Sequence, residues 1–121
     1  MYKITKQFGF EASHCLTHLK EGHPCRNVHG HSYKVELELQ SEILNKEGMI
    51  IDYRDLDWVK KWIEGTFDHR HLNDVLKEKE GWFTTSENLA LFIYRCLKSA
   101  LPELSAVTVK ETEKTSARYE E

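Results

Sequence analysis

Residues 29–40 read HGHSYKVELELQ, and the alternation in this stretch decides the fold. Side chains two positions apart share a face of a β-strand, so a period of two in hydropathy predicts a strand with one buried face. The apolar face carries His31, Tyr33, Val35, Leu37 and Leu39. His29 lies two residues before His31, so both imidazoles are expected to project from this same face.

A second strand with the same period is predicted near the N-terminus. One face of this segment holds Tyr2, Ile4, Phe8, Phe10, Ala12 and His14, and the alternation breaks at Lys6. If the two strands are antiparallel neighbours, His14, His29 and His31 meet at one end of the sheet. Three neutral imidazoles with an open fourth position are typical of a catalytic zinc site, so we predict Zn²⁺ there. The alternative is a pair of buried, hydrogen-bonded histidines beside an unrelated loop.

Residues 15–28, between these strands, are expected to form a loop. They show no periodicity and contain Gly22 and Pro24. His18 and His23 fall in this loop and are expected to be exposed. Cys15 is out of phase with His14 and is not expected to bind a metal.

Two helices are predicted in the middle of the chain. The first covers roughly residues 53–66 after an N-cap at Asp52, and its apolar stripe is Leu56, Val59, Trp62 and Ile63. The second begins near Thr85 and ends before Pro102, and Thr84 with Glu87 has the spacing of a capping box. Its buried stripe is expected to be Leu89, Phe92, Ile93, Cys96 and Leu97.

The last 20 residues are predicted to form two more strands, which completes the order strand, strand, helix, helix, strand, strand. This order predicts an α+β fold, a four-stranded antiparallel sheet with two helices packed on one face. A length of 121 residues fits a single domain, 1–121. The edges of such a sheet favour pairing with other subunits.

Composition excludes several classes of function. The 17 Lys and Arg residues against 20 Asp and Glu give a net charge of −3, which argues against binding nucleic acid through its phosphates. No apolar run approaches the roughly 20 residues that span a bilayer, so no membrane partner is expected. Three cysteines without a secretion signal favour a reducing, cytoplasmic location.

Three further groups could carry chemistry. Cys25 lies four residues before His29, and a thiol beside a metal ion loses its proton more readily, although Cys25 could instead be a fourth ligand. Asp68 precedes His69, a pairing typical of acid–base catalysis, although taken alone it is more typical of a solvated loop. Glu111 shares a strand face with apolar residues, so its carboxylate is expected to need a ligand with N–H donors unless the strand ends before it.

These residues together resemble the 6-pyruvoyl-tetrahydropterin synthase family along nearly the whole chain. The matching segments are FEASH at 10–14, Cys25-x-x-x-HGHSY ending at Tyr33, IIDY at 50–53, DHRHLN at 68–73, TSEN at 85–88 and KET at 110–112, followed by Ala117 and Tyr119. Within the family, the short spacing from Cys25 to His29 is similar to that of the 6-carboxy-5,6,7,8-tetrahydropterin synthase branch.

The resemblance implies the tunnelling fold, in which the sheets of three subunits close a barrel and two trimers stack. It therefore implies a homohexamer with active sites between subunits. It also implies zinc on His14, His29 and His31, with 7,8-dihydroneopterin triphosphate as substrate. Glu111, Thr85 and Ser86 would bind the pterin. Cys25 would move one proton, and His69, oriented by Asp68, a second.

The implied reaction is a zinc-dependent lyase step in the biosynthesis of queuosine, a 7-deazaguanine. Its products would be 6-carboxy-5,6,7,8-tetrahydropterin, acetaldehyde and triphosphate. One alternative is the 6-pyruvoyl-tetrahydropterin synthase activity of the same family, which only eliminates triphosphate. A second alternative is a non-catalytic pterin- or zinc-binding module. The sequence leaves open whether His71 takes part in acid–base work.

Overall fold

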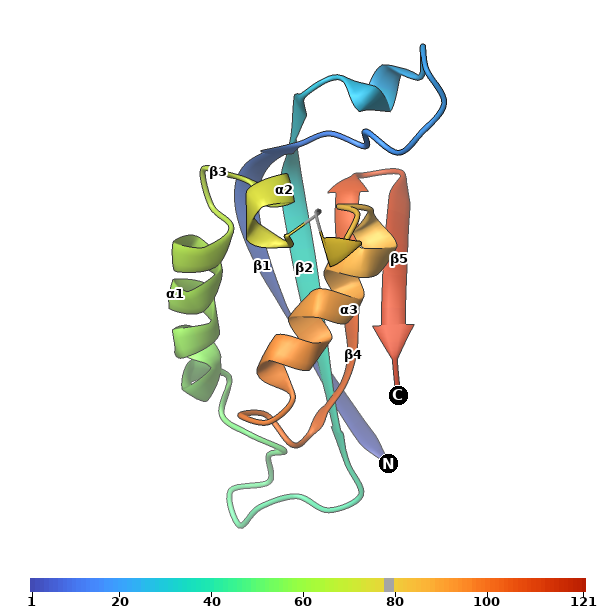
Figure 1. Cartoon of the computed structure of the whole chain (residues 1–121). Helices are drawn as coiled ribbons and strands as arrows, with labels where there is room; N and C mark the ends of the chain where they lie inside the picture. Colours follow the sequence, from blue (N-terminus) through green and yellow to red (C-terminus); the bar gives the residue numbers. More distant parts are fainter. Residues whose placement is uncertain (78–79) are drawn as a thin grey trace.

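The computed structural model describes residues 1–77 and 80–121, and Figure 1 shows its elements. The strands are β1 (Tyr2–His14), β2 (His29–Ser41), β3 (Arg70–His71), β4 (Leu104–Thr112) and β5 (Thr115–Glu120). The α-helices are α1 (Asp57–Thr66), α2 (Leu72–Val75) and α3 (Ser86–Leu97). Two 3₁₀ turns, η1 (Pro24–Arg26) and η2 (Tyr53–Leu56), complete the order.

The five strands form one sheet in the order β3-β1-β2-β4-β5. The two longest, β1 and β2, are antiparallel and pair along their whole length, from Tyr2 opposite Ser41 to His14 opposite His29. β4 pairs with β2, and β5 pairs with β4, both antiparallel. This register confirms the predicted neighbourhood of the first two strands.

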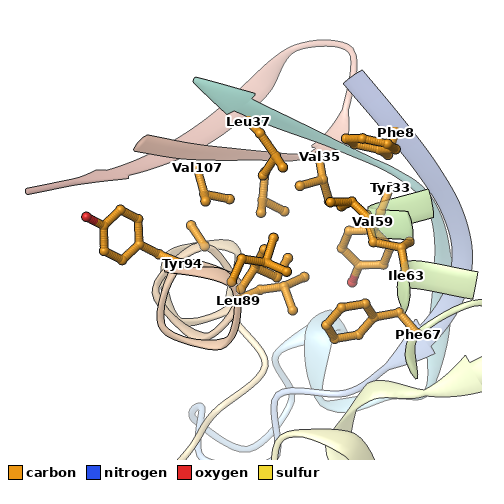
Figure 2. Packing of buried hydrophobic residues seen from close by; sticks show 14 of the residues in the cluster. Phe8, Tyr33, Val35, Leu37, Val59, Ile63, Phe67, Leu89, Tyr94 and Val107 are labelled. Atoms are coloured by element: carbon orange, nitrogen blue, oxygen red, sulfur yellow. The ribbon is translucent and has the colours of Figure 1, made fainter. Parts of the chain in front are cut away.

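All three α-helices lie on one side of the sheet, the side that the alternation marks as apolar (Figure 1). Val59 and Ile63 of α1 and Leu89 of α3 face Val35 and Leu37 of β2 across a continuous core (Figure 2). Burial of such side chains contributes about 1.5–3 kcal/mol each, which fixes the layer on which the site is built. Among the described residues, no helix is long and apolar enough to cross a membrane.

The structure corrects the predicted topology in one detail. The sheet has a fifth strand, β3, and it runs parallel to β1 through pairs at Ala12 and Ser13. A strand of two residues is too short to show an alternation in hydropathy, so the sequence does not predict it. The same segment also contains the four-residue helix α2, where the sequence indicates only an irregular stretch.

Two predictions at α3 are wrong. The N-cap is Thr85, whose hydroxyl accepts a hydrogen bond from the N–H of Asn88 at 3.2 Å, and Thr84 is not the cap. Cys96 is exposed, because the buried stripe of α3 runs through Leu89, Ala90, Ile93, Tyr94 and Leu97. The cap at Asp52 is confirmed, since its carboxylate accepts from the N–H of Arg54 at 2.9 Å and starts η2 ahead of α1.

Candidate metal centre and active site

Three histidines converge at one end of the sheet, as the strand periods predict. His14 ends β1 directly opposite His29, the first residue of β2, and His31 lies opposite Ala12. Their ring centroids are 4.5–5.2 Å apart. One nitrogen from each ring lies within 4.8 Å of the others, close enough for a single metal ion to join them.

Two of these rings have a fixed tautomer. Nδ1 of His14 lies 2.9 Å from the carbonyl oxygen of Thr84, and Nδ1 of His29 lies 2.7 Å from that of Asn27. A carbonyl oxygen only accepts, so Nδ1 is the donor in both rings and each Nε2 keeps its lone pair. Burial lowers the pKa of His14 to about 4, so this ring is neutral near pH 7. Neutral imidazoles are the form that binds metals.

The unsatisfied buried atoms also belong to this cluster. Within residues 1–77 and 80–121, the buried side-chain nitrogen and oxygen atoms without a hydrogen-bond partner are Nε2 of His14, Nε2 of His31 and the hydroxyl of Tyr33. An unpaired buried polar atom costs about 1–3 kcal/mol, so such atoms indicate an absent ligand. A three-nitrogen donor set of this kind fits a divalent transition-metal ion.

Glu111 lies beside the three histidines. Its Oε2 is 3.8 Å from Nε2 of His31, and its side chain is only 24% exposed. β4 continues through Glu111, so its carboxylate points to the apolar face, as the sequence predicts. The site therefore combines a metal-binding end with an acceptor for N–H groups.

Asp68 and His69 contact each other, which adjacency in the sequence could not establish. Oδ2 of Asp68 is 2.9 Å from Nδ1 of His69, and its Oδ1 accepts from the backbone N–H of Glu11 at 2.8 Å. The hydrogen bonds from Glu11 and His69 keep the pKa of Asp68 below its usual range. His69 adopts a left-handed φ of 57° and its side chain is 80% exposed. The pair lies at the edge of β1, outside the histidine cluster.

Cys25 is half-buried in η1, and among the described residues its sulfur is not part of the three-histidine donor group. The loop around it is well held. Leu16 donates its N–H to the carbonyl of Cys25 at 2.7 Å, and the guanidinium of Arg26 donates to the carbonyls of Thr17 and Leu19. Cys25 therefore has a defined place four residues before the start of β2.

The remaining polar residues named from the sequence have structural contacts. Thr85 and Ser86 begin α3, where Thr85 acts as the cap and Ser86 donates to the carboxylate of Glu87 at 3.1 Å. His71 lies in β3 with its Nδ1 2.9 Å from the hydroxyl of Ser13. His18 and His23 are exposed as predicted. The ring of His18 stacks on Phe83, and His23 caps η1.

Comparison with known proteins identifies the family. The 6-pyruvoyl tetrahydropterin synthase family matches residues 3–121. The chain belongs to this family.

Relatives from both branches of the family resemble the chain along almost its full length. It is 32% identical to the 6-carboxy-5,6,7,8-tetrahydropterin synthase of Haemophilus influenzae over 100% of both chains. It is 37% identical to the Synechocystis protein of the same name, over 98% of this chain and 93% of the relative. The solved 6-pyruvoyl tetrahydropterin synthase of Caenorhabditis elegans superposes with a TM-score of 0.86 at 28% identity, covering 99% and 95% of the two chains.

Two further residues support the site in this family member. The sequence patterns did not indicate a functional role for either of them. Thr84 is 1% exposed and its carbonyl accepts from His14, whereas the sequence pattern indicated a helix cap. Asn73 is buried and binds the backbone of Cys15. The sequence signal for this contact is the place of Asn73 directly after the apolar Leu72. An amide that becomes buried beside an apolar residue needs hydrogen-bond partners.

Proposed function

We propose that this chain is a zinc-dependent lyase that converts 7,8-dihydroneopterin triphosphate and water into 6-carboxy-5,6,7,8-tetrahydropterin, acetaldehyde and triphosphate. One observation carries the proposal: a three-histidine donor set with the carboxylate of Glu111 3.8 Å from His31. The names of the relatives add support to the proposal, because two relatives that match over nearly their full length are named for this activity.

His14, His29 and His31 would hold the metal through ring nitrogens. Zinc is the ion that neutral imidazoles with an open fourth position suit best. When bound, it supplies a Lewis acid that lowers the pKa of the substrate's side-chain hydroxyls. The hydrogen bonds that fix Nδ1 of His14 and His29 as donors would leave Nε2 of each ring to coordinate.

Glu111 would hold the amino-pyrimidine edge of the pterin. A carboxylate accepts two parallel N–H bonds, and such charge-assisted bonds are about twice as strong as neutral ones. Thr85 and Ser86 would add contacts at the start of α3. The cap leaves the O–H of Thr85 able to donate, since its oxygen accepts from Asn88.

Cys25 and His69 would move the protons. As a thiolate, Cys25 would take a proton from the substrate side chain. His69 would act as the second acid–base group, and Asp68 would orient its ring from 2.9 Å. No external redox cofactor is needed, because the ring is reduced at the expense of the side chain.

We propose that the active unit is a homohexamer, a dimer of trimers. The Asp68–His69 pair lies at the edge of β1, with the His69 side chain 80% exposed and outside the histidine cluster of its own chain. An acid–base pair in that position is suited to serve a site whose metal belongs to a neighbouring subunit. The proposed location is the cytoplasm and the proposed pathway is queuosine biosynthesis.

The second candidate is 6-pyruvoyl-tetrahydropterin synthase activity, in which the substrate loses triphosphate without carbon–carbon cleavage. It is favoured by the close match in fold to the Caenorhabditis elegans protein of that name. The same residues would take the same places, so the two candidates differ in product alone.

Triphosphate release tests the function that both candidates share. The zinc-loaded protein is incubated with 7,8-dihydroneopterin triphosphate, and triphosphate is followed by anion-exchange chromatography. We expect release that stops when zinc is chelated and returns when zinc is restored. Tight zinc binding without any turnover would contradict both candidates and favour a non-catalytic zinc- or pterin-binding module.

A further inference from the structure

The backbone directly after His14 is held by a side chain in place of a strand. The β1–β2 pairing ends at His14, and the β1–β3 pairing ends at Ser13, so Cys15 lies beyond both ladders. Its buried N–H donates to Oδ1 of Asn73 at 3.0 Å, and its carbonyl accepts from Nδ2 of Asn73 at 2.8 Å. A carboxamide offers one acceptor and one donor side by side, as a neighbouring strand would.

Thr84 connects this pair of Asn73–Cys15 hydrogen bonds to the His14 ring. Its carbonyl accepts from Nδ1 of His14 at 2.9 Å, and its hydroxyl lies 3.2 Å from the same nitrogen. The hydroxyl is also 3.4 Å from the carbonyl of Cys15 and 3.5 Å from Oδ1 of Asn73. Three separate segments, the end of β1, α2 and the approach to α3, thus meet around one imidazole.

We infer that Asn73 and Thr84 form a positioning pair for His14, which fixes the place and the tautomer of this ring so that its Nε2 is presented to a metal ion. The inference rests on the proposed metal site. Neither residue belongs to the three histidines that would hold the metal. Both act through His14. The hydrogen bonds of Asn73 fix the backbone next to His14, and the carbonyl of Thr84 fixes the orientation of the imidazole ring.

Burial makes this arrangement specific. His14 and Thr84 are each 1% exposed and Asn73 is 8% exposed, so no solvent replaces a lost partner. Outer partners of ligating histidines typically change metal affinity by about 10–100-fold when removed. A purely structural contact would change stability and leave the affinity of the folded protein unchanged.

The test compares Asn73→Ala and Thr84→Val with Ser105→Ala as the matched control. Ser105 is also buried and hydrogen-bonded, to the backbone and carboxylate of Glu38, but it lies at the opposite end of β4 from Glu111. Zinc affinity is measured by competition with a chromophoric chelator, and the His14 tautomer by ¹⁵N NMR of the metal-free protein at neutral pH.

We expect the wild type and Ser105→Ala to bind zinc equally, with the proton of His14 on Nδ1. Asn73→Ala should lose about tenfold or more in affinity and show a mixed tautomer. Thr84→Val keeps the carbonyl and should lose about fivefold, the equivalent of one hydrogen bond. Thr84→Val also carries the test alone if Asn73→Ala does not fold.

Wild-type affinity and an unmixed tautomer in the folded variants would overturn the positioning role. Failure of the proposed metal site would give a different result from failure of the positioning role. In that case the wild-type protein itself would bind zinc no better than His31→Ala does.

Discussion

The carboxylate of Glu111 lies 3.8 Å from Nε2 of His31, on neighbouring strands of one sheet. The β2–β4 register pairs Lys34 with Lys110, so the next residues toward the site, Tyr33 and Glu111, follow on adjacent strands. The candidate pterin acceptor lies one residue beyond the last pair of this ladder, and the candidate metal ligand lies three residues beyond it, on the two strands that the ladder joins. Their spacing is fixed by the fold and does not depend on a loop.

Glu111→Gln should weaken pterin binding and leave zinc binding intact. The amide loses one acceptor and the negative charge, and a charged hydrogen bond contributes about 1.5–3 kcal/mol, which corresponds to a rise in KM of roughly 10–100-fold. Glu113→Gln is the control, because this carboxylate is 81% exposed two residues further on. Equal KM values for the two variants would count against Glu111 as the pterin acceptor.

His31→Ala should abolish tight zinc binding. Removing one of the three proposed ligands would leave a two-nitrogen site. We expect the zinc affinity to fall by more than about 100-fold, which is more than the loss of an outer hydrogen-bond partner causes. Chelator competition measures it, with His18→Ala as a control because that ring is exposed and stacks on Phe83. A metal that remains bound in His31→Ala would show that the ligands lie elsewhere.

Mixing two inactive variants should restore activity if sites form between subunits. Cys25→Ala and His69→Ala each remove one of the two groups proposed to move protons, and each variant alone should lose most turnover. After joint unfolding and reassembly in equal amounts, random mixing leaves about a quarter of the sites with both groups intact. Turnover near that fraction is expected. Activity that stays at the level of the separate variants would place both groups in one chain's site.

The free energy of unfolding should fall at acidic pH, and protonation of Glu38 should cause part of that fall. Burial by itself raises the pKa of Glu38, but hydrogen bonds from Arg118 and Ser105 outweigh burial and bring the pKa below its usual range. A carboxyl with a lower pKa in the folded state stabilises it above the ordinary value of about 4.3, and this stabilisation is lost as the pH falls through the folded pKa.

Thermal unfolding across acidic pH measures this effect. Glu38→Gln should flatten the acid limb of the stability curve, whereas Glu36→Gln, two residues earlier on the same strand face, should leave its slope in place. An unchanged slope in Glu38→Gln would contradict the assignment to this carboxyl.

The three-histidine cluster could be predicted from the sequence because it depends on a period of two. Alternation places His29 and His31 on the face of Val35, and the same phase runs through Phe10 to His14. Once both strands are paired, no other information is needed to bring the three rings together. Glu111 followed from the same argument on a third strand.

The rest of the site depends on contacts between distant segments, which no local pattern contains. Asp68 meets His69 because the backbone of Glu11, 57 positions earlier than Asp68, holds the carboxylate and the left-handed turn. Asn73 reaches Cys15 across 58 positions. The helix cap lies at Thr85, one position after the predicted Thr84, because a cap at either residue satisfies nearly the same sequence pattern.

The identity of the product distinguishes the proposed lyase activity from 6-pyruvoyl-tetrahydropterin synthase activity. The zinc-loaded protein is given 7,8-dihydroneopterin triphosphate, and mass spectrometry follows pterins while acetaldehyde is trapped as a hydrazone. The proposed lyase activity predicts 6-carboxy-5,6,7,8-tetrahydropterin with one acetaldehyde for each triphosphate released. A 6-pyruvoyl pterin without acetaldehyde would contradict it and assign the chain to the other branch of its family.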